Sequence, residues 1–434
     1  KPSQPGGASM WSKRRRWAAS ALEGEDVLRV PDTKMTILDG FGQVVSSRPL
    51  ERADLLNESA QIRMLKCFHL NERFGTFELP SPLTNRLLTE FQDTYSWVCQ
   101  STTNMPREGG KVEPYYMMLR AGPRSKLHFD PHDPAACAAI VSCGGICPGL
   151  NSVIREVVNT LWDYGVRRIY GIKGGYKGVV EPDKWIELTP TVVKDIHSQG
   201  GTILVSDRGN PPTADMAAAL KAKGVRQYFV LGGDGTHKGA SQTFDACLDI
   251  EHECAVIGVP KTIDNDVPLL DQTFGFDTAC TEALKAVDSA YVEACCNANC
   301  IGLVKLMGRH CGFIAMHATL ASRHVDICLL PEMDIDVEKV LNHVAHLMRT
   351  KRRAVIVVAE GCGDTLIQSS GAVDAGGNKV LADAGLWLKG AITKRMKELQ
   401  IPLTIKYIDP TYMIRSIPAN AFDSQYCSTL AQNA

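Results

Sequence analysis

The sequence predicts an α/β protein with two doubly wound, Rossmann-like lobes of parallel-rich sheet, preceded by an irregular N-terminal extension. Two observations predict this fold. From about residue 135 onward, short runs rich in Val, Ile and Ala alternate with stretches that repeat apolar residues at helical spacing. These runs are apolar throughout, which is typical of strands covered on both faces by helices. In this fold class, ligands bind where the carboxyl ends of strands lead into helices.

The elements follow in order along the chain. Residues 1–110 show weak periodicity with scattered Pro and Gly, so no regular lobe is expected there. The expected strands cover 138–141, 227–231, 254–259, 300–306 and 354–358, and the clearest helices cover 153–161, 313–322 and 382–399. We predict an extension at 1–120, a first α/β lobe at 121–265 and a second α/β lobe at 266–434.

The composition is that of a soluble globular protein. The chain has 434 residues, of which 44% are hydrophobic and 22% charged, enough for two or three domains. A net charge of −1 argues against a nucleic-acid or membrane surface, and no apolar run approaches a bilayer span of about 20 residues. Fifteen cysteines without a disulfide framework indicate a reducing compartment. We expect the cytoplasm, with a plastid as the alternative.

The turn Gly232-Gly233-Asp234-Gly235-Thr236 follows one expected strand. Its glycines would let phosphate oxygens approach the backbone, and Asp234 offers an oxygen ligand to Mg²⁺. A tight turn in which Asp234 caps the next helix is the simpler alternative. The glycine-rich turn after the strand at 138–141 is a weaker signal, because it matches neither a Walker A motif nor a dinucleotide fingerprint.

The segment Pro260–Asp266 holds two carboxylates, a hydroxyl and a lysine at the end of another apolar strand. Buried carboxylates are costly unless they bind a metal, a proton or a ligand. Asp264 is the natural general base for a substrate hydroxyl, Asp266 could support it, and Lys261 could neutralise phosphate charge. A plain turn of Asp and Asn residues is the alternative.

Arg309 and Glu360 follow the two strands expected in the second lobe, at 300–306 and 354–358. Met307-Gly308-Arg309 places a guanidinium at a strand end, where it suits the charge on a transferring phosphoryl group, although a lone arginine there is more often in a surface ion pair. Glu360 could accept hydrogen bonds from sugar hydroxyls or cap a turn. A clamp for an anionic substrate is plausible near the chain's end, at Lys406, Tyr412 and Arg415.

These motifs in series resemble the phosphofructokinase family, from about Arg120 to the last residue. The stretch Gly275–Ala279 and the long leader are most similar to the ATP-using plant and protist branch. The resemblance implies the phosphofructokinase fold, fructose 6-phosphate as acceptor and Mg²⁺ as cofactor. It implies that the lobe at 121–265 binds the nucleotide and that the lobe at 266–434 binds the sugar phosphate. It also implies that the family's closing elements would follow Ala434, and that the protein is a homo-oligomer, a dimer or a tetramer.

The resemblance implies a role for each matching residue. Asp264 matches the catalytic base, with Thr262, Asp266 and Arg309 beside it, and Asp234 matches the Mg²⁺ position. The nucleotide-contacting positions are matched by Gly144, Tyr176, Arg208, Gly209, Gly233, Asp234, Gly235 and Thr236. The sugar-phosphate positions are matched by Thr262, Ile263, Asp264, Met307, Gly308, Arg309, Glu360, Lys406, Tyr412 and Arg415.

The phosphoryl donor is indicated by Gly235. Pyrophosphate-using relatives carry a second aspartate at this position, which would crowd and repel the α-phosphate of a nucleotide. Gly235 therefore favours ATP, whereas Lys261 is shared with pyrophosphate users. Where bacterial relatives bring an arginine across a subunit interface, this chain has Cys300.

Other functions stay open at this point. The chain could be a pyrophosphate-dependent enzyme, or a non-catalytic regulatory paralogue that binds sugar phosphate. A kinase of NAD or lipids would also use Gly-Gly-Asp-Gly-Thr, but not the other two motifs. The basic run Arg349, Lys351, Arg352 and Arg353 could bind an anionic regulator or form a solvated edge.

Overall fold

A computed structural model of the chain describes residues 34–38, 44–49, 63–64, 70–75, 77–83, 91–92, 97–100, 116–120, 122–133, 137–207, 209–267, 270–367 and 382–434. The chain divides into two compact units. The smaller comprises Lys1–Cys67 and Asp93–Arg120, and the larger comprises Phe68–Gln92 and Ala121–Ala434. Part of the predicted extension therefore groups with the α/β region.

The smaller unit contains short strands, where the sequence had predicted irregular chain. Strands β1 (Lys34–Leu38) and β2 (Val44–Pro49) form an antiparallel pair. A three-stranded sheet has the order β3-β6-β5, with bounds Arg63–Met64, Tyr116–Leu119 and Trp97–Gln100. The larger unit begins with the short helix α3 (Asn71–Phe74) and the antiparallel pair of β4 (Leu79–Pro80) and β7 (Lys126–Leu127).

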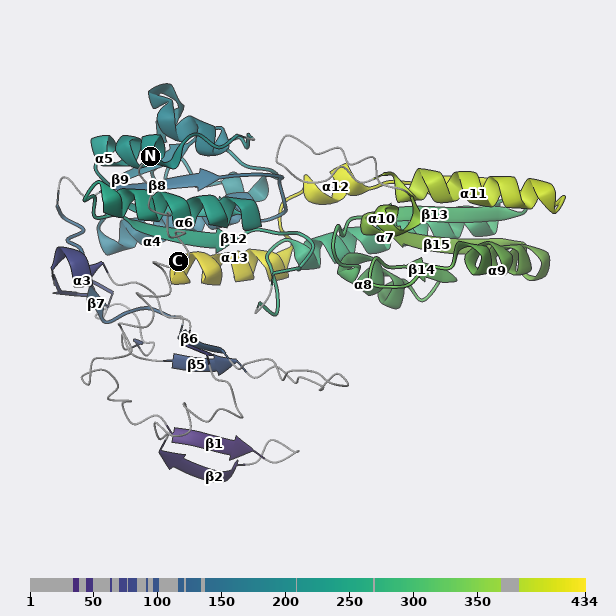
Figure 1. Ribbon diagram of the computed structural model, residues 1–434, viewed down its shortest axis with the longest axis horizontal. Helices are drawn as coiled ribbons and strands as arrows, with labels where there is room; N and C mark the ends of the chain where they lie inside the picture. Colours follow the sequence, from purple (N-terminus) through teal and green to yellow (C-terminus); the bar gives the residue numbers. More distant parts are fainter. Residues whose placement is uncertain are drawn as a thin grey trace, which may run out of the picture. The chain divides into compact units, whose positions relative to one another are not determined.

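The first lobe of the larger unit is built on a five-stranded sheet of order β10-β9-β8-β11-β12 (Figure 1). All neighbouring pairs are parallel except β10 with β9. The strands are β8 (Cys137–Ser142), β9 (Arg168–Ile172), β10 (Trp185–Glu187), β11 (Val225–Gly232) and β12 (Ala255–Pro260). The helices are α4 (Leu150–Tyr164), α5 (Thr213–Lys223) and α6 (Asp234–Asp249), with the short 3₁₀ turns η1 (Gly175–Val180), η2 (Pro182–Lys184) and η3 (Ile196–Ser198).

The continuous apolar strands of this sheet separate two cores. Successive side chains point to opposite faces of a strand. On β8, Ala138 and Ile140 join a core with α4, whereas Cys137, Ala139 and Val141 join one with α5 and α6. Both faces are covered, which explains why the strand carries no polar alternation.

The second lobe has an all-parallel sheet of order β14-β15-β13-β16. The strands are β13 (Cys300–Leu306), β14 (Ile327–Leu329), β15 (Arg353–Ala359) and β16 (Thr404–Ile408). The helices are α7 (Phe276–Cys296), α8 (Phe313–Ser322), α9 (Val337–Thr350), α10 (Gly363–Leu366), α11 (Ala384–Glu398) and α12 (Thr411–Arg415), with a 3₁₀ turn η4 (Glu360–Cys362). Every residue of β15 from Ala354 to Ala359 is buried, so this sheet is also covered on both faces.

The last helix, α13 (Ala421–Asn433), returns to the first lobe (Figure 1). It packs along α4, and its Cys427 and Ala431 belong to the core that α4 forms with the first sheet. The two predicted lobes were contiguous ranges, so the packing of α13 against the first lobe was not predicted. The lobe boundary at residue 265 stays a prediction.

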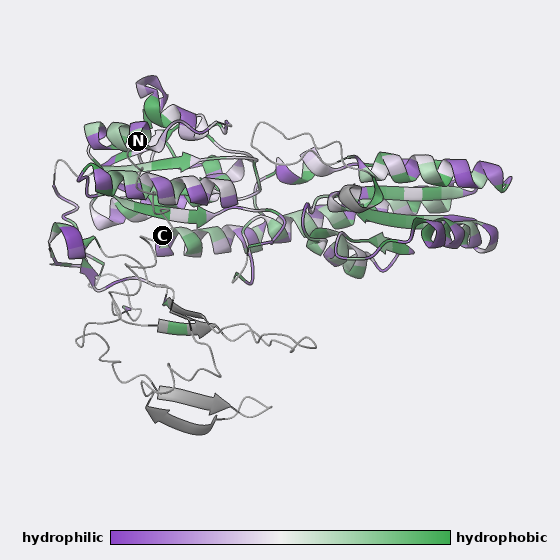
Figure 2. Ribbon diagram, viewed as in Figure 1, coloured by the Kyte–Doolittle hydropathy of each residue, from purple (hydrophilic) through white to green (hydrophobic). Residues whose placement is uncertain are grey.

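The predicted fold class is confirmed, with two lobes of parallel-rich sheet flanked by helices. Figure 2 shows the strands of both sheets as largely hydrophobic and several covering helices as divided between hydrophobic and hydrophilic residues. Among the described residues, no helix is both long enough and apolar enough to cross a membrane.

Candidate active site

The strand order places a crevice between β8 and β11. The chain runs from β8 to its neighbour β9 on one side, and β11 and β12 lie on the other side. The loops that follow β8 and β11 therefore diverge, which opens a ligand site at the carboxyl ends of the strands. A cleft of about 620 Å³ lies there. It is lined by Cys143, Gly144, Gly145, Tyr176, Asp207, Gly209, Asn210, Gly233, Asp234, Gly235, Thr236, Lys261, Thr262, Asp264, Asp266, Val267, Arg309 and His310.

The turn after β8 is held by hydrogen bonds to its carbonyl groups. Gly144 has a φ of 78°, a conformation that favours glycine. The Ser206 hydroxyl donates to the Gly144 carbonyl, and the buried Lys261 Nζ donates to the Gly145 carbonyl at 2.6 Å. Lys261 thus joins the turn after β8 to the loop after β12.

The turn after β11 becomes the first turn of α6. Gly233 is the N-cap residue, and Asp234, Gly235 and Thr236 follow as the first three helical residues. The Tyr176 hydroxyl donates to the Thr236 carbonyl at 2.6 Å, which ties this turn to η1. The N-terminus of a long helix favours anions. A Cβ at Gly235 would meet no atom within 4 Å, so the cleft has free space there.

The loop after β12 presents Asp264 to the cleft. Its Oδ2 accepts a hydrogen bond from the Arg309 backbone N–H at 3.2 Å. Its Oδ1 is buried and has no hydrogen-bond partner in the described part of the chain. Thr262 Oγ1 accepts from the Asp264 backbone N–H at 3.2 Å and donates to Asp266 Oδ1 at 2.7 Å. The loop thus fixes Asp264 while leaving one of its oxygens available.

Burial raises the pKa of Asp264 to about 7, which the hydrogen bond from Arg309 opposes and the negative charges of Glu360 and Asp266 reinforce. An ordinary aspartate has a pKa near 3.8. A carboxylate that titrates near neutrality is suited to take a proton from a hydroxyl group at physiological pH. Perturbed carboxylates in clefts are also a general mark of functional sites.

The end of β13 needs glycine for its geometry. Gly308 has a φ of 125°, and a Cβ there would lie 2.3 Å from the Cys311 carbonyl oxygen. The Gly308 carbonyl accepts from the Gly361 N–H at 2.9 Å, so the ends of β13 and β15 are joined. This arrangement brings Arg309 to the cleft.

Glu360, at the end of β15, lies within the electrostatic reach of both Asp264 and Arg309. Burial raises its pKa, while the positive charges of Lys305 and Arg309 lower it. Lys305 is held by two carboxylates, at 3.1 Å from Asp383 and 2.7 Å from Asp409. These two carboxylates compensate the positive charge of Lys305.

The structure does not bring every predicted residue to the cleft. The Ile263 side chain packs against the apolar cores of both lobes. Lys406 lies opposite Gly302, about 17 Å along β13 from Met307, and its Nζ is 3.4 Å from Glu293 on α7. Met307 is buried in the core, and Arg208 lies outside the described residues.

Tyr412 and Arg415 are both on α12, outside the cleft lining. The Arg415 guanidinium lies over the Tyr412 ring, 4.7 Å from its centroid, and Tyr412 is 71% exposed. Arg415 also lowers the pKa of Glu360 through its charge. Both side chains therefore lie near the second lobe's strand ends without lining the cavity.

Several cleft residues were absent from the predicted site. Asp207 and Asn210 flank the predicted pair Arg208 and Gly209. Cys143, Gly145, Val267 and His310 flank predicted residues, so a wider window around each motif would have included them.

The residues that line the cleft can hold a metal through one carboxylate. Asp234 is exposed at the start of α6 and lines the cleft. Within the described residues, no group of three or more His, Cys, Asp and Glu side chains could hold a metal alone. This fits Mg²⁺, which is bound through one or two carboxylates together with substrate phosphates.

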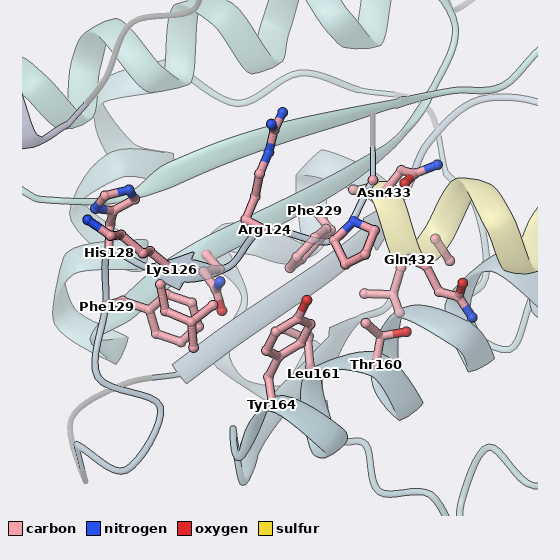
Figure 3. A pocket seen from close by; sticks show the side chains of 17 residues that line it. Arg124, Lys126, His128, Phe129, Thr160, Leu161, Tyr164, Phe229, Gln432 and Asn433 are labelled. Atoms are coloured by element: carbon pink, nitrogen blue, oxygen red, sulfur yellow. The ribbon is translucent and has the colours of Figure 1, made fainter. Parts of the chain in front are cut away.

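A second hollow has a volume of about 320 Å³. Its lining residues, shown in Figure 3, place it at the opposite end of the first sheet. Gln227 and Phe229 line it from the amino-terminal half of β11, and Tyr164 contributes from the end of α4. One of its basic residues, Lys126, pairs with Glu78 at 2.6 Å. Because ligands of open α/β sheets bind at the carboxyl ends of strands, the first cleft is the candidate active site.

Comparison with known proteins finds a matching family and similar sequences. The phosphofructokinase family model matches residues 137–434. The chain is 48% identical over 322 residues to ATP-dependent 6-phosphofructokinase 7 of Arabidopsis thaliana, covering 73% of this chain and 66% of that protein. It is 49% identical over 319 residues to the chloroplastic ATP-dependent 6-phosphofructokinase 5 of the same plant, covering 73% of this chain and 59% of that protein.

A solved structure is similar in fold. The pyrophosphate-dependent phosphofructokinase of Marinobacter aquaeolei aligns with a TM-score of 0.56 and 21% identity, over 68% of this chain and 74% of that one. At this identity the likeness concerns the fold alone. The chain spans about two thirds or less of the length of the two plant relatives.

Proposed function

The chain belongs to the phosphofructokinase family, and we propose that it transfers the γ-phosphoryl group of MgATP to the 1-hydroxyl of fructose 6-phosphate. The products are fructose 1,6-bisphosphate and ADP, as in glycolysis. The plant relatives named as ATP-dependent 6-phosphofructokinases support this assignment.

One observation carries the proposal: Asp264 is a partly buried carboxylate with a pKa of about 7, one fixed oxygen and one buried oxygen without a partner among the described residues. A sugar hydroxyl that donates to the Oδ1 atom would satisfy this orphan acceptor. As the hydroxyl oxygen attacks the phosphoryl group, Asp264 takes the proton. Thr262 keeps the loop in register, since it bonds both Asp264 and Asp266.

Arg309 has the role of stabilising the transferring group. Its backbone N–H holds Asp264, and its side chain lines the same cleft. Guanidinium groups lower the energy of the transition state by meeting the charge on the equatorial phosphoryl oxygens. Asp264 and Arg309 are therefore held together by the hydrogen bond at the turn that begins with Gly308.

The phosphates of the donor would lie along the two glycine turns. The first turn of α6 offers a helix N-terminus, and Gly235 leaves space beside it. This space supports a nucleotide donor, because a carboxylate at that position would repel the α-phosphate. Gly144, Tyr176 and Gly209 line the cleft, and Arg208, which lies outside the described residues, completes the proposed nucleotide set.

The residues present fit magnesium. Asp234 would hold it, and the bound ion would neutralise the charge of the donor phosphates. The exposed position of Asp234 at the cleft is what supports this assignment.

The fructose 6-phosphate side of the site is assigned to the second lobe's strand ends, with Glu360 and the backbone of Ile263, Met307 and Gly308. Lys406 is far from its own cleft, so a contact with sugar phosphate would be made in a neighbouring subunit. We therefore propose a homo-oligomer, a dimer or a tetramer, which light scattering coupled to size exclusion would measure. We place the protein in the cytoplasm, with a plastid as the alternative.

A coupled assay tests the function. Purified protein is given fructose 6-phosphate with either MgATP or Mg-pyrophosphate, and fructose 1,6-bisphosphate is measured. Turnover with ATP at least tenfold above that with pyrophosphate supports the proposal. The reverse ratio would identify a pyrophosphate-dependent enzyme, and binding of fructose 6-phosphate without turnover would identify a non-catalytic regulatory protein.

A further inference from the structure

Helix α7 begins at a glycine that cannot be replaced. It is 21 residues long, the longest helix among the described residues, and its N-cap residue Gly275 has a φ of 88°. A Cβ on Gly275 would lie 2.7 Å from the Pro148 carbonyl oxygen, in the turn that leads from β8 to α4. This close approach excludes the Ser, Thr, Asp or Asn side chain that normally satisfies the first N–H groups of a helix.

The missing cap is supplied by α13. Asp423 Oδ2 accepts from the backbone N–H of Thr278, the third residue of α7, at 2.7 Å, and from the Thr278 hydroxyl at 2.5 Å. Asp423 is fully buried and Thr278 is 2% exposed. A carboxylate 145 residues away in sequence therefore occupies the place of an N-cap side chain.

The two helix N-termini cap each other. Asn420, the N-cap residue of α13, accepts from the Asp423 N–H at 3.0 Å and donates through its amide to Asp277 of α7 at 2.6 Å. The positive ends of two helix dipoles meet at this junction, which would be unfavourable without negative charge between them. Asp423 and Asp277 provide that charge.

The same helix also reaches both loops of the cleft. Cys427 Sγ donates to the carbonyl of Gly149, the N-cap residue of α4, at 3.5 Å. The Tyr426 hydroxyl donates to the Gln272 carbonyl at 2.8 Å. Gln272 follows the Asp264 loop in sequence. The next residue, Thr273, is joined to that loop, because its N–H donates to Asn265 Oδ1 at 2.8 Å. One face of α13 therefore contacts the end of the turn after β8, the segment after the Asp264 loop and the start of α7.

We propose that Asp423 is a positioning residue, which holds the start of α7 against Pro148 and so fixes the glycine turn that receives the donor nucleotide. Asp423 bonds Thr278, Gly275 approaches the Pro148 carbonyl closely, and Pro148 belongs to the turn that carries Gly144 and Gly145 into the cleft. Asp423 touches neither substrate. The proposal rests on the proposed function for its kinetic readout only.

The test compares Asp423→Asn with Gln425→Ala, an exposed control on the same helix. Asp423→Asn removes the negative charge that strengthens both hydrogen bonds from Thr278, and the KM for ATP is expected to rise about tenfold. The KM for fructose 6-phosphate is expected to change less than about twofold. Hydrogen–deuterium exchange in segments 144–149 and 272–278 is expected to accelerate, whereas Gln425→Ala changes none of these.

A second pair of variants covers the case in which Asp423→Asn does not fold. Thr278→Val removes one donor to Asp423, and Thr278→Ser keeps it. The valine variant is expected to show the same changes to a smaller extent, and the serine variant none. Unchanged KM for ATP with unchanged exchange in 144–149, despite a lower melting temperature, would overturn the inference. If the wild-type protein does not use ATP, the proposed function fails, and the exchange experiment alone decides the inference.

Discussion

Replacing Asp264 with asparagine should remove activity while making the protein more stable above neutral pH. The folded-state pKa of Asp264 is about 7, against 3.8 for an ordinary aspartate, because the group is buried. Between these values the folded protein retains a proton that the unfolded chain has released. Stability therefore falls by about 1.4 kcal/mol per pH unit as the pH rises, or about 4 kcal/mol in total. The asparagine side chain does not titrate, so the variant avoids this loss.

Urea denaturation at several pH values measures the effect. The stability advantage of Asp264→Asn over the wild type is expected to grow by about 2–3 kcal/mol between pH 5 and pH 8. Asp271→Asn is the control, because Asp271 is an exposed carboxylate that follows the same loop and does not act on the pKa of Asp264. A difference between Asp264→Asn and the wild type that does not change with pH, or a variant that is less stable at every pH, would refute the reasoning.

Three further changes test the donor site, the arginine and the strand end. Gly235→Asp has space for its side chain and should keep the fold, but the added carboxylate should repel the nucleotide's α-phosphate and lower kcat/KM for ATP at least about 100-fold. The control Gly235→Ala should keep ATP turnover, and equal ATP kinetics in both variants would contradict the assignment. Arg309→Lys retains the charge but loses the planar fork, and kcat in the coupled assay should fall about 100-fold without a matching rise in KM. Gly308→Ala forces a Cβ to within 2.3 Å of the Cys311 carbonyl and should destabilise the protein by about 2–4 kcal/mol in urea denaturation, whereas an unchanged midpoint would show that the turn is not constrained.

The strand ends were predictable because their signals are local. Apolar runs followed by Gly-Gly-Asp-Gly-Thr or by Gly-Arg mark where a strand stops and a helix starts, and the sheet topology brings those points together. The position of Asp264 in the cleft follows from this logic. The pKa of Asp264 does not, since it depends on burial in the folded chain and on Arg309 and Glu360, which follow β13 and β15.

The contacts of the site that escaped prediction join residues far apart in sequence. The sequence predicts that Lys261 neutralises phosphate charge. It does not predict the hydrogen bond from Lys261 to the Gly145 carbonyl, because the two residues are 116 positions apart. Asp423 was not singled out, because nothing near it in sequence shows that α7 lacks a cap of its own. Ile263 precedes Asp264 in sequence, but its side chain packs against the apolar cores.

The most direct test of Asp264 as the base is the pH dependence of kcat for phosphoryl transfer from ATP to fructose 6-phosphate, measured for the wild type and Asp264→Asn. The base must be ionised to accept the proton, so wild-type kcat is expected to rise with pH through an apparent pKa near 7. The variant is expected to lose at least about 100-fold in kcat and to show no such rise. Near-normal turnover in Asp264→Asn, with the same pH profile, would contradict the account.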